Sequence, residues 1–377
     1  MVPPVGAILP RRLVSLDVFR GLTIAAMLLV NNPGSWSDVY APLLHAPWHG
    51  WTPTDLVFPF FLFIVGVAIP FAFEKRRAAG AGRGELLAKA LRRAVILFLL
   101  GLFLSGFPRF DLANLRIPGV LQRIAVCYLA AAALYLVTGA RGRAVAAATL
   151  LLGYWAAMAL VPVPGFGPGV LEPEANLAAW LDREILGMAH LWKSSQTWDP
   201  EGILSTVPAI STVLLGAFTG TWLRSERPAR EKTTGLVLGG TAGIGLGLIW
   251  NLVFPINKNL WTSSYVIFTA GCALLVLGLC YRVVDVAGWR RGLAPLLAYG
   301  TNAIAAFVLS GLLARILVLV KVPSGDGGRA LKTVLYESLF APWAPPKLAS
   351  LGFAVATVLF WLVPMGLLYR RGIFLRV

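Results

Sequence analysis

The segments GLTIAAMLLV (21–30), NNPGSWSDVYAPLLHAPWHGWTPTD (31–55) and LVFPFFLFIVGVAI (56–69) follow one another and decide the fold of this chain. The first and third are apolar and belong to expected spans of membrane length, about 13–32 and 55–73. The loop between them is polar, rich in Trp and Pro, and carries His45 and His49, two of the three histidines in the chain. Such a loop reaches both water and the membrane interior, where imidazole is well suited to moving protons near neutral pH. We therefore predict that function resides in this loop.

The whole chain has the composition of a membrane protein. Hydrophobic residues make up 58% of its 377 residues and charged residues 13%, against about 45–50% and about 25% in soluble proteins. Apolar runs near the roughly 20 residues of a membrane helix recur along its length. This composition predicts an all-α, polytopic transmembrane bundle. Little chain is left for a soluble domain, so we expect residues 1–377 to form a single transmembrane domain.

About ten membrane spans account for the apolar runs. Their expected ranges are 13–32, 55–73, 93–107, 117–138, 144–162, 203–223, 233–254, 264–281, 294–319 and 349–369. The third span has a short apolar core, AVILFLLGLFLSGF, and can be tilted or broken. Loops 163–202 and 320–348 are long enough to cover an outer vestibule, and five tryptophans are expected at that interface: Trp180, Trp192, Trp198, Trp261 and Trp343.

The net charge of +16 is spread over alternate loops. Most of the 33 Lys and Arg residues fall before residue 13, in loops 74–92, 139–143, 224–232 and 282–293, and in the tail from 370. The positive-inside rule places these segments in the cytoplasm, so both termini are expected inside and the His45 loop outside. The pattern excludes a nucleic-acid partner, because the cations form no single face. An Ala-, Gly- and Arg-rich composition favours a bacterial plasma membrane. The three cysteines lie in apolar runs without a C-x-x-C pair, so neither a disulfide nor a metal is expected.

Charged residues inside a span are functional candidates, because each costs about 2.5–3.5 kcal/mol on insertion scales. The sequence SLDVFRG places Asp17 and Arg20 three residues apart on one helical face near the cytoplasmic end of the first span. They either form a structural ion pair, or Arg20 faces a phosphate-bearing substrate that arrives from the cytoplasm. Both residues are therefore assigned to a predicted donor site.

Other polar residues gather mainly at the opposite ends of the spans. The segment LRIPGVLQR places Arg116, Gln122 and Arg123 at the start of the fourth span. They either anchor this helix at the headgroups or hold an anionic or sugar-like group, and we assign them to donor binding. The remaining candidates, assigned to acceptor binding, are Trp48 in HAPWHG, Asp199 and Glu201 in WDPEG, Asn257, Lys258 and Asn259 in PINKNLW, and Asn302 in YGTNAI. Helix capping explains Asp199 and Glu201 equally well.

The order of these motifs is more specific than any one of them. The chain presents DVFRG, then Asn31, then H-A-x-W-x-G-x-T-x-x-D-L-V-F-P-x-F, LRIPGVLQR, DPEG, PINKNLW and VVDV. This series resembles the membrane catalytic domain of heparan-α-glucosaminide N-acetyltransferase and its bacterial relatives, from about residue 12 to the C-terminus. The opening LDVFRG is also similar to a wider set of membrane acyltransferases.

The resemblance implies a multi-span enzyme that takes acetyl from acetyl-CoA and delivers it to a glucosamine amine across a membrane. The active-site histidine of the family corresponds to His45 and its paired asparagine to Asn31, whereas His49 stands where the lysosomal enzyme has another residue and is given no role. The luminal β-rich domain of that enzyme is not expected here. The acceptor is then an amino sugar, a cell-wall glycan or a lipid-linked saccharide, and a homodimer is expected.

Two chemical routes remain open for His45. As a general base on the acceptor it would contribute about 10²–10⁴-fold, with Asn31 donating to the thioester oxygen. As a nucleophile it would first form acetyl-imidazole. Asp55 either orients the imidazole or caps the second span. The phosphates of acetyl-CoA are expected near Arg20 and the inner basic residues Lys75, Arg76 or Arg92.

Two other classes of protein remain as alternatives. A transporter of a glycolipid or anionic solute could use the Asn and Arg clusters to line a path, although no internal repeat is evident in the sequence. A non-catalytic assembly or sensor subunit does not explain a His, Asn and Arg set at one mouth. Release of CoA that depends on an added amino sugar separates the enzyme from both.

Overall fold

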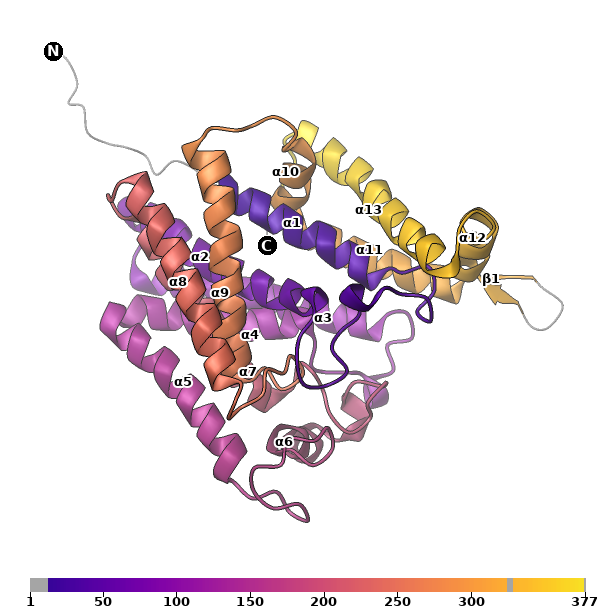
Figure 1. Cartoon of the computed structure of the whole chain (residues 1–377), viewed down its shortest axis with the longest axis horizontal. Helices are drawn as coiled ribbons and strands as arrows, with labels where there is room; N and C mark the ends of the chain where they lie inside the picture. Colours follow the sequence, from indigo (N-terminus) through magenta and orange to yellow (C-terminus); the bar gives the residue numbers. More distant parts are fainter. Residues whose placement is uncertain (1–12, 324–327, 376–377) are drawn as a thin grey trace.

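The structure, a computed structural model, describes residues 13–323 and 328–375 (Figure 1). Most of these residues are helical. Strands β1 (Lys321–Val322) and β2 (Arg329–Ala330) form one short antiparallel pair. The all-α prediction is confirmed. Residues 1–12, on which part of the assignment of the N-terminus rests, lie outside the described residues.

Eight helices in the described residues are long and apolar enough to cross a membrane. They are α1 (Val14–Asn31), α2 (Val57–Ala78), α4 (Val120–Val137), α5 (Ala140–Leu160), α7 (Ile203–Arg224), α8 (Ala229–Trp250), α9 (Ser263–Cys280) and α13 (Pro346–Arg370). A π-helical turn, η5 (Tyr281–Val286), continues α9. These bounds lie close to the predicted spans, and a polytopic helical bundle is confirmed.

A ninth span is obtained if α10 (Ala294–Thr301) and α11 (Ala303–Leu319) are counted together. They are bent by 82° at Asn302, so the region predicted as the ninth span, 294–319, consists of two helices and not one straight helix. The Asn302 side chain explains the break: its Nδ2 donates to the Ile373 carbonyl at 3.2 Å and its Oδ1 accepts from the Leu375 N–H at 2.9 Å. The amide therefore holds the C-terminal tail at the point where the helix turns.

Helix α3 (Arg83–Gly106) begins ten residues before the predicted third span. Residues 83–92 were expected in a loop and are helical, because Ala, Leu and Lys favour helix and Glu85 pairs with Lys89 one turn later, at 2.5 Å. The first turns of α3 carry too many charges for a membrane span. A total of ten spans stays a prediction.

The remaining elements are short and lie in the connections. Two α-helices, α6 (Leu177–Leu186) and α12 (Leu331–Leu339), occupy the two long loops. Four 3₁₀ turns complete the structure: η1 (Ala41–Leu43), η2 (Pro53–Leu56), η3 (Leu112–Asn114) and η4 (Met188–His190). Of these, η1 and η2 belong to the His45 loop.

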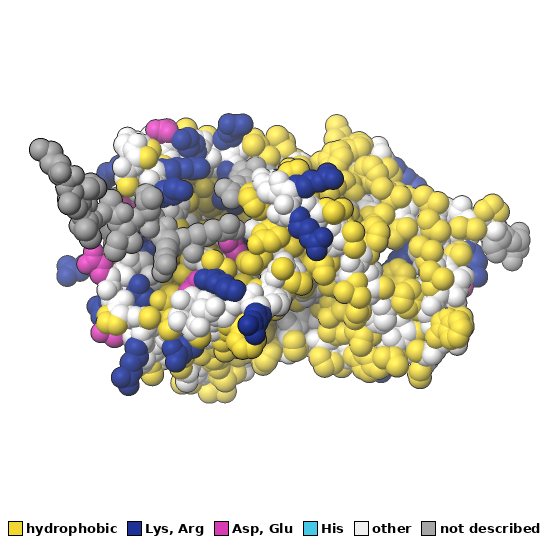
Figure 2. Space-filling view, turned by 90° about the horizontal axis from the view of Figure 1, so that it is seen from above, with side chains coloured by type: hydrophobic (Ala, Val, Ile, Leu, Met, Phe, Trp, Pro, Cys, Tyr) yellow, Lys and Arg dark blue, Asp and Glu magenta, His cyan; other side chains and the backbone are white. Residues whose placement is uncertain are grey.

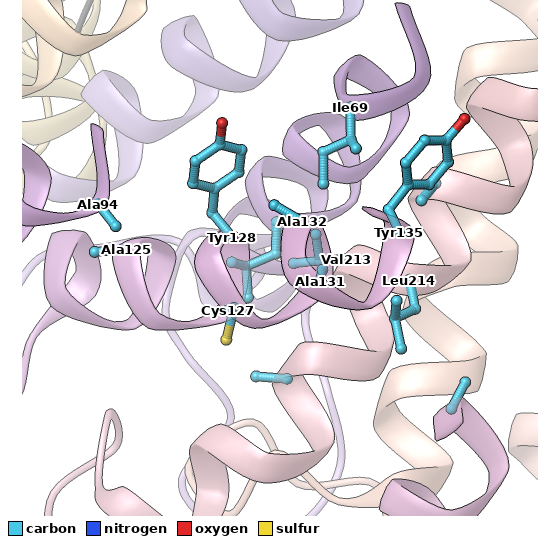
Figure 3. Packing of buried hydrophobic residues seen from close by; sticks show 14 of the residues in the cluster. Ile69, Ala94, Ala125, Cys127, Tyr128, Ala131, Ala132, Tyr135, Val213 and Leu214 are labelled. Carbon is cyan, nitrogen blue, oxygen red and sulfur yellow. The ribbon is translucent and has the colours of Figure 1, made fainter. Parts of the chain in front are cut away.

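Small residues bring the central helices close together. A Cβ atom added at Gly66 of α2 would lie 2.0 Å from the Val213 carbonyl oxygen of α7, and one at Gly216 would lie 2.1 Å from the Phe63 carbonyl oxygen. The backbones of α2 and α7 therefore touch, as small residues allow in membrane helices. Figure 3 shows α4 beside this contact, with Ala125 opposite Ala94 of α3 and with Ala131 and Ala132 close to Ile69 of α2 and Val213 of α7.

The two ends of the bundle differ in chemistry. We call the end that carries loop 32–56 the His45 end, and the end where α1 begins the Arg20 end. Figure 2 shows a face on which Lys and Arg side chains gather toward the left and hydrophobic side chains cover most of the right. Exposed apolar residues on α8, α11 and α13, such as Leu238, Ile316 and Leu359, fit lipid contact.

One predicted interface residue is misplaced by the sequence reasoning. Trp261 was expected in an aromatic belt at the membrane surface, yet its side chain is 0% exposed. Its ring packs against Phe58 and Tyr265, and its indole N–H donates to Thr212 Oγ1 at 3.2 Å. Trp343, in contrast, is 84% exposed.

Candidate functional site

His45 and Asp55 are brought together by the fold of the loop between α1 and α2. Thr52 and Asp55 form a capping box that starts η2, with Asp55 Oδ2 accepting from the Thr52 N–H at 2.9 Å. The same oxygen accepts from the Ala46 N–H at 3.0 Å. The other oxygen, Oδ1, lies 2.6 Å from His45 Nδ1. Asp55 thus both caps the second span and orients the imidazole, the two alternatives that the sequence left open.

This contact determines which nitrogen of His45 carries the proton in the neutral imidazole. Asp55 is 1% exposed, whereas the His45 side chain is 48% exposed. An ionised carboxylate only accepts hydrogen bonds, so Nδ1 carries the proton and Nε2 keeps its lone pair. The arrangement presents a fixed proton acceptor to the solvent-facing side of the loop.

Lys258 lies beside Nε2 of His45. Its Nζ is 3.4 Å from His45 Nε2. Burial lowers the pKa of the Lys258 amine, and the nearby carboxylates of Glu201 and Asp55 oppose that shift. Asp55, His45 and Lys258 therefore form a line of three titratable groups drawn from segments about 200 residues apart in the chain.

The turn that carries Lys258 is rigid. Asn257 is 0% exposed; its Oδ1 accepts from the Leu260 N–H at 2.9 Å, and its own N–H donates to Thr262 Oγ1 at 3.0 Å. With Oδ1 so used, the Asn257 amide nitrogen donates to His49 Nδ1 at 3.3 Å. Asn259 lies half-buried in the same turn. The predicted acceptor-binding residues of PINKNLW are thus beside the histidine loop.

His49 belongs to this site although it was given no role. Because its Nδ1 accepts from Asn257, its proton lies on Nε2, and burial lowers the pKa of this imidazole against the opposing charge of Glu172. The four-residue spacing in HAPWHG is the only signal in the sequence. Between the two histidines, Trp48 donates to the Leu171 carbonyl at 2.9 Å and packs on Trp198.

Arg116, Asp199 and Glu201 pair with one another. Arg116 donates from Nε and Nη2 to the two oxygens of Asp199 at 2.8 and 2.7 Å, and from Nη2 to Glu201 at 2.5 Å. Burial alone would raise the pKa of Glu201. The positive charges of Arg116 and Lys258 outweigh the effect of burial and hold this pKa below its usual value. Hydrogen bonds to the carboxylates likewise raise the pKa of Arg116 despite its burial. This network fixes the carboxylate that faces Lys258.

Gln122 and Arg123 are buried inside the bundle. Gln122 donates to the Ile117 carbonyl at 3.1 Å and fixes the turn before α4. Arg123 is 2% exposed, donates to the Gly202 carbonyl at 3.2 Å and lies over the Trp261 ring. Both were predicted at a donor site, and the structure gives each of them a place in the support of this end of the bundle.

Asp182 was missed by the sequence reasoning. It is 1% exposed, and its Oδ1 accepts from the Ile203 N–H at 2.8 Å at the start of α7. Burial raises the pKa of this carboxyl to about 7. It lies in the long loop 163–202 without a motif around it, so nothing in the sequence singled it out.

The Arg20 end holds a cavity of about 460 Å³. Arg20 Nη1 pairs with Asp17 at 2.9 Å and with the Gly300 carbonyl at 3.1 Å, and both charged side chains line the cavity. Arg76 and Arg93 line it as well. The predicted partners Lys75 and Arg92 are not in this wall. Asn302, beside Gly300, lies at this end and not near His45.

Asn31 lines a different cavity, of about 930 Å³, between α1, α3, α11, α12 and α13. Phe307 of α11 lines both cavities, so they adjoin at its ring. His45 is not part of either wall among the described residues. Asn31 thus ends α1 on the wall of this cavity, and His45 lies in the loop that follows α1.

These features define a polytopic helical membrane protein with a carboxylate-oriented histidine at one end of its bundle. Residues 12–245 match the family described as heparan-alpha-glucosaminide N-acetyltransferase, catalytic, and the chain belongs to this family. The human heparan-alpha-glucosaminide N-acetyltransferase is 32% identical over 357 residues, covering 80% of this chain and 53% of that protein. The mouse protein of the same name is 30% identical over 351 residues, covering 79% and 53%. The chain thus spans about half the length of these relatives.

Proposed function

We propose that this protein is a membrane acetyltransferase that moves acetyl from acetyl-CoA to an amino sugar or glycan on the extracytoplasmic side. The observation that carries this proposal is the line Asp55–His45–Lys258 at the mouth of the bundle. The name of the family supports the reaction class. By the positive-inside rule, the Lys- and Arg-rich loops would lie in the cytoplasm of a bacterium, and the His45 end would then lie on the extracytoplasmic side of the membrane.

In the direct route His45 acts as general base. The acceptor amine attacks the thioester carbonyl, the C–N bond forms, and the C–S bond breaks. The amine proton passes to His45 Nε2 and then to the departing thiolate, giving the CoA thiol. Asp55, already on Nδ1, stabilises the transient imidazolium, as in other His–carboxylate sites. The Lys258 amine, when protonated, is placed to donate to the carbonyl oxygen as negative charge develops on it.

In the covalent route His45 Nε2 attacks the thioester first, the C–S bond breaks, and CoA leaves as a thiolate that takes a proton from solvent. The acceptor amine then attacks the acetyl-imidazole, the N–acetyl bond to His45 breaks, and the amine proton is lost to the released imidazole. The exposed Nε2 suits either route. Incubation with labelled acetyl-CoA in the absence of acceptor distinguishes them: label retained on the protein supports the covalent route, and thiol release only when both substrates are present supports direct transfer.

The cavity at the Arg20 end is the proposed site for the phosphates of acetyl-CoA. Three guanidinium groups, those of Arg20, Arg76 and Arg93, line it, and guanidinium suits phosphate oxygens. The Arg93 Nε is buried without a hydrogen-bond partner in the part of the chain that the structure describes. An unpaired buried donor is costly, so an anionic ligand would satisfy it. The pantetheine arm would pass Phe307 toward Asn31, whose amide is proposed to donate to the thioester oxygen.

The test is CoA release by the purified protein in detergent, given acetyl-CoA with and without glucosamine. Glucosamine-dependent release that is lost in His45→Ala supports the proposal. His190→Gln is a matched control, because His190 binds the Leu115 carbonyl through Nδ1 and lies outside the proposed chemistry. Release within a few-fold of wild type in His45→Ala would contradict the role of His45.

Transport is a second candidate function, because the structure contains a broken helix beside cavities at both ends of the bundle. Discontinuous helices are typical of transporter substrate sites. Reconstituted vesicles separate the two functions. Movement of intact acetyl-CoA or amino sugar across the bilayer without thiol release would favour transport over acetyl transfer.

A further inference from the structure

The cavity of about 930 Å³ beside Asn31 is larger than an amino sugar needs. Its wall on α11 runs from Phe307 to Leu319, a rise of twelve residues, or about 18 Å at 1.5 Å per residue. It therefore extends along a large part of one membrane span. A water-soluble glycan bound at the mouth would leave this depth unused.

The wall is mainly apolar. Leu313, Leu317 and Val318 of α11 face Phe353 and Phe360 of α13 across it. The polar side chains in this lining are few: Asn31, Asn32, Ser310, Arg315, Lys332 and Thr357. Such a lining is favourable for hydrocarbon and unfavourable for the hydroxyl groups of a free sugar, which would lose their hydrogen bonds to water.

Two cations interrupt the apolar wall, Arg315 on α11 and Lys332 on α12. Arg315 donates to the carbonyl of Gly311 in its own helix at 2.9 Å. The Lys332 ammonium lies 6.0 Å from the ring centres of both Trp36 and Phe353. Over residues 13–323 and 328–375, neither cation is ion-paired with Asp or Glu, in contrast to Arg77 and Arg116.

Cations that face an apolar wall are unfavourable unless a counter-charge accompanies them. An anionic group held between apolar walls would offset this cost and would take hydrogen bonds from both side chains. The combination of a long apolar cavity and two such cations matches an amphiphile with a hydrocarbon chain and a phosphate. Asn31, on the same wall, lies where the polar end of this molecule would emerge toward the histidine loop.

We propose that this cavity binds a lipid-linked acceptor, a hydrocarbon chain joined through phosphate to an amino sugar. This inference rests on the proposed function for its acetyl transfer, and the lipid site itself stands on the cavity alone. The chain occupies the apolar wall, Arg315 and Lys332 hold the phosphate, and the sugar amine reaches the site of Asn31 and His45. The acceptor thus enters from the bilayer.

Binding of farnesyl phosphate to the purified full-length protein tests the site without any acetyl transfer. We expect farnesyl phosphate to bind, farnesol to bind more weakly, and inorganic phosphate not to compete. The double variant Arg315→Gln/Lys332→Gln should weaken binding of farnesyl phosphate by about tenfold or more, because two charge-assisted contacts are lost. The double variant Arg227→Gln/Lys89→Gln, which removes two surface cations, is the matched control and should bind like wild type.

A cavity-filling variant, Ala356→Phe, tests the apolar wall and should also reduce binding. Each variant is compared with wild type for its melting temperature, so that loss of fold is seen separately. Equal binding of farnesyl phosphate and farnesol, unaffected by the double variant, would overturn the proposal in favour of an ordinary bilayer lipid in the cavity.

The acetyl-transfer assay with soluble glucosamine keeps the two proposals apart. Glucosamine-dependent CoA release without binding of farnesyl phosphate would overturn the lipid site and leave the acetyltransferase intact. Binding of farnesyl phosphate without CoA release from any amino sugar would leave the lipid site intact and contradict the acetyltransferase.

Discussion

The Lys258 Nζ lies 3.4 Å from His45 Nε2, on the opposite side of the ring from the nitrogen that Asp55 holds. The imidazole is therefore placed between a carboxylate and an amine. Because burial lowers the pKa of Lys258, its charge is lost at lower pH than that of an ordinary lysine. The protonation state of this amine becomes a variable of the reaction.

Replacement of Lys258 by arginine should change the pH dependence of acetyl transfer. If the positive charge at this position is required, the rate of wild type falls on the alkaline side as Lys258 loses its proton, below its ordinary value of about 10.4. Arginine keeps its charge over the whole range, so this alkaline limb should disappear in Lys258→Arg. A pH–rate profile from about pH 6 to about pH 10 checks this, and an alkaline limb that stays in place would show that another group titrates.

Asp55→Asn should reduce CoA release by about 10²–10⁴-fold, because an amide no longer fixes the proton on Nδ1 or stabilises the imidazolium. The fold should be less affected, since the asparagine side chain still offers one oxygen to the N–H groups of Thr52 and Ala46. Asp38→Asn in the same loop is the control: Asp38 accepts from Ser35 Oγ at 2.9 Å and takes no part in the site. A rate within a few-fold of wild type would remove Asp55 from the mechanism.

Gly66→Ala should destabilise the bundle by about 1–3 kcal/mol, because its Cβ would lie 2.0 Å from the Val213 carbonyl oxygen and α2 would have to move away from α7. Gly153→Ala is the matched control, since no atom lies within 4 Å of a Cβ built there. Thermal unfolding in detergent gives the comparison. Equal melting temperatures for the two variants would mean that the α2–α7 contact is looser than described.

Asp182→Asn should remove a pH dependence of stability. Burial raises the pKa of Asp182 from 3.8 to about 7. Between these values the folded state holds a proton that the unfolded state has released, so stability falls as pH rises through this window, by up to about 4 kcal/mol. The asparagine variant, which cannot ionise, should lose less stability between about pH 5 and about pH 8. Parallel curves for wild type and variant would contradict the burial of an ionisable carboxyl here.

The sequence predicted most of the membrane helices. It also predicted that the His45 loop and the PINKNLW turn lie at the same end of the bundle. Apolar runs of membrane length predict α1, α2 or α7 within a few residues, because the bilayer imposes both length and composition. The same reasoning failed at Asn302. An apolar run over 294–319 has no mark of a break, and the tail residues that pair with Asn302 come seventy positions later.

The residues of the site also fall into two groups, those that the sequence predicted and those that only the structure revealed. His45 and Asp55 are ten positions apart, and the loop motif suggested their pairing before the structure showed it. Lys258 and Asp182 depend on tertiary contacts. The first was one polar residue among three in its turn, and the second had no motif. Trp261 was misplaced because tryptophan at a span end is typical of the membrane interface, and only packing reveals that this one is enclosed.

The contact between Asn302 and the tail has a consequence for the donor. Leu375 gives its N–H to Asn302 and lines the cavity that carries Arg20. One of the last described residues of the chain thus forms part of the wall of the cavity through which acetyl-CoA is proposed to enter. A substitution that removes the Asn302 amide would therefore alter the helix break and the wall of this cavity together.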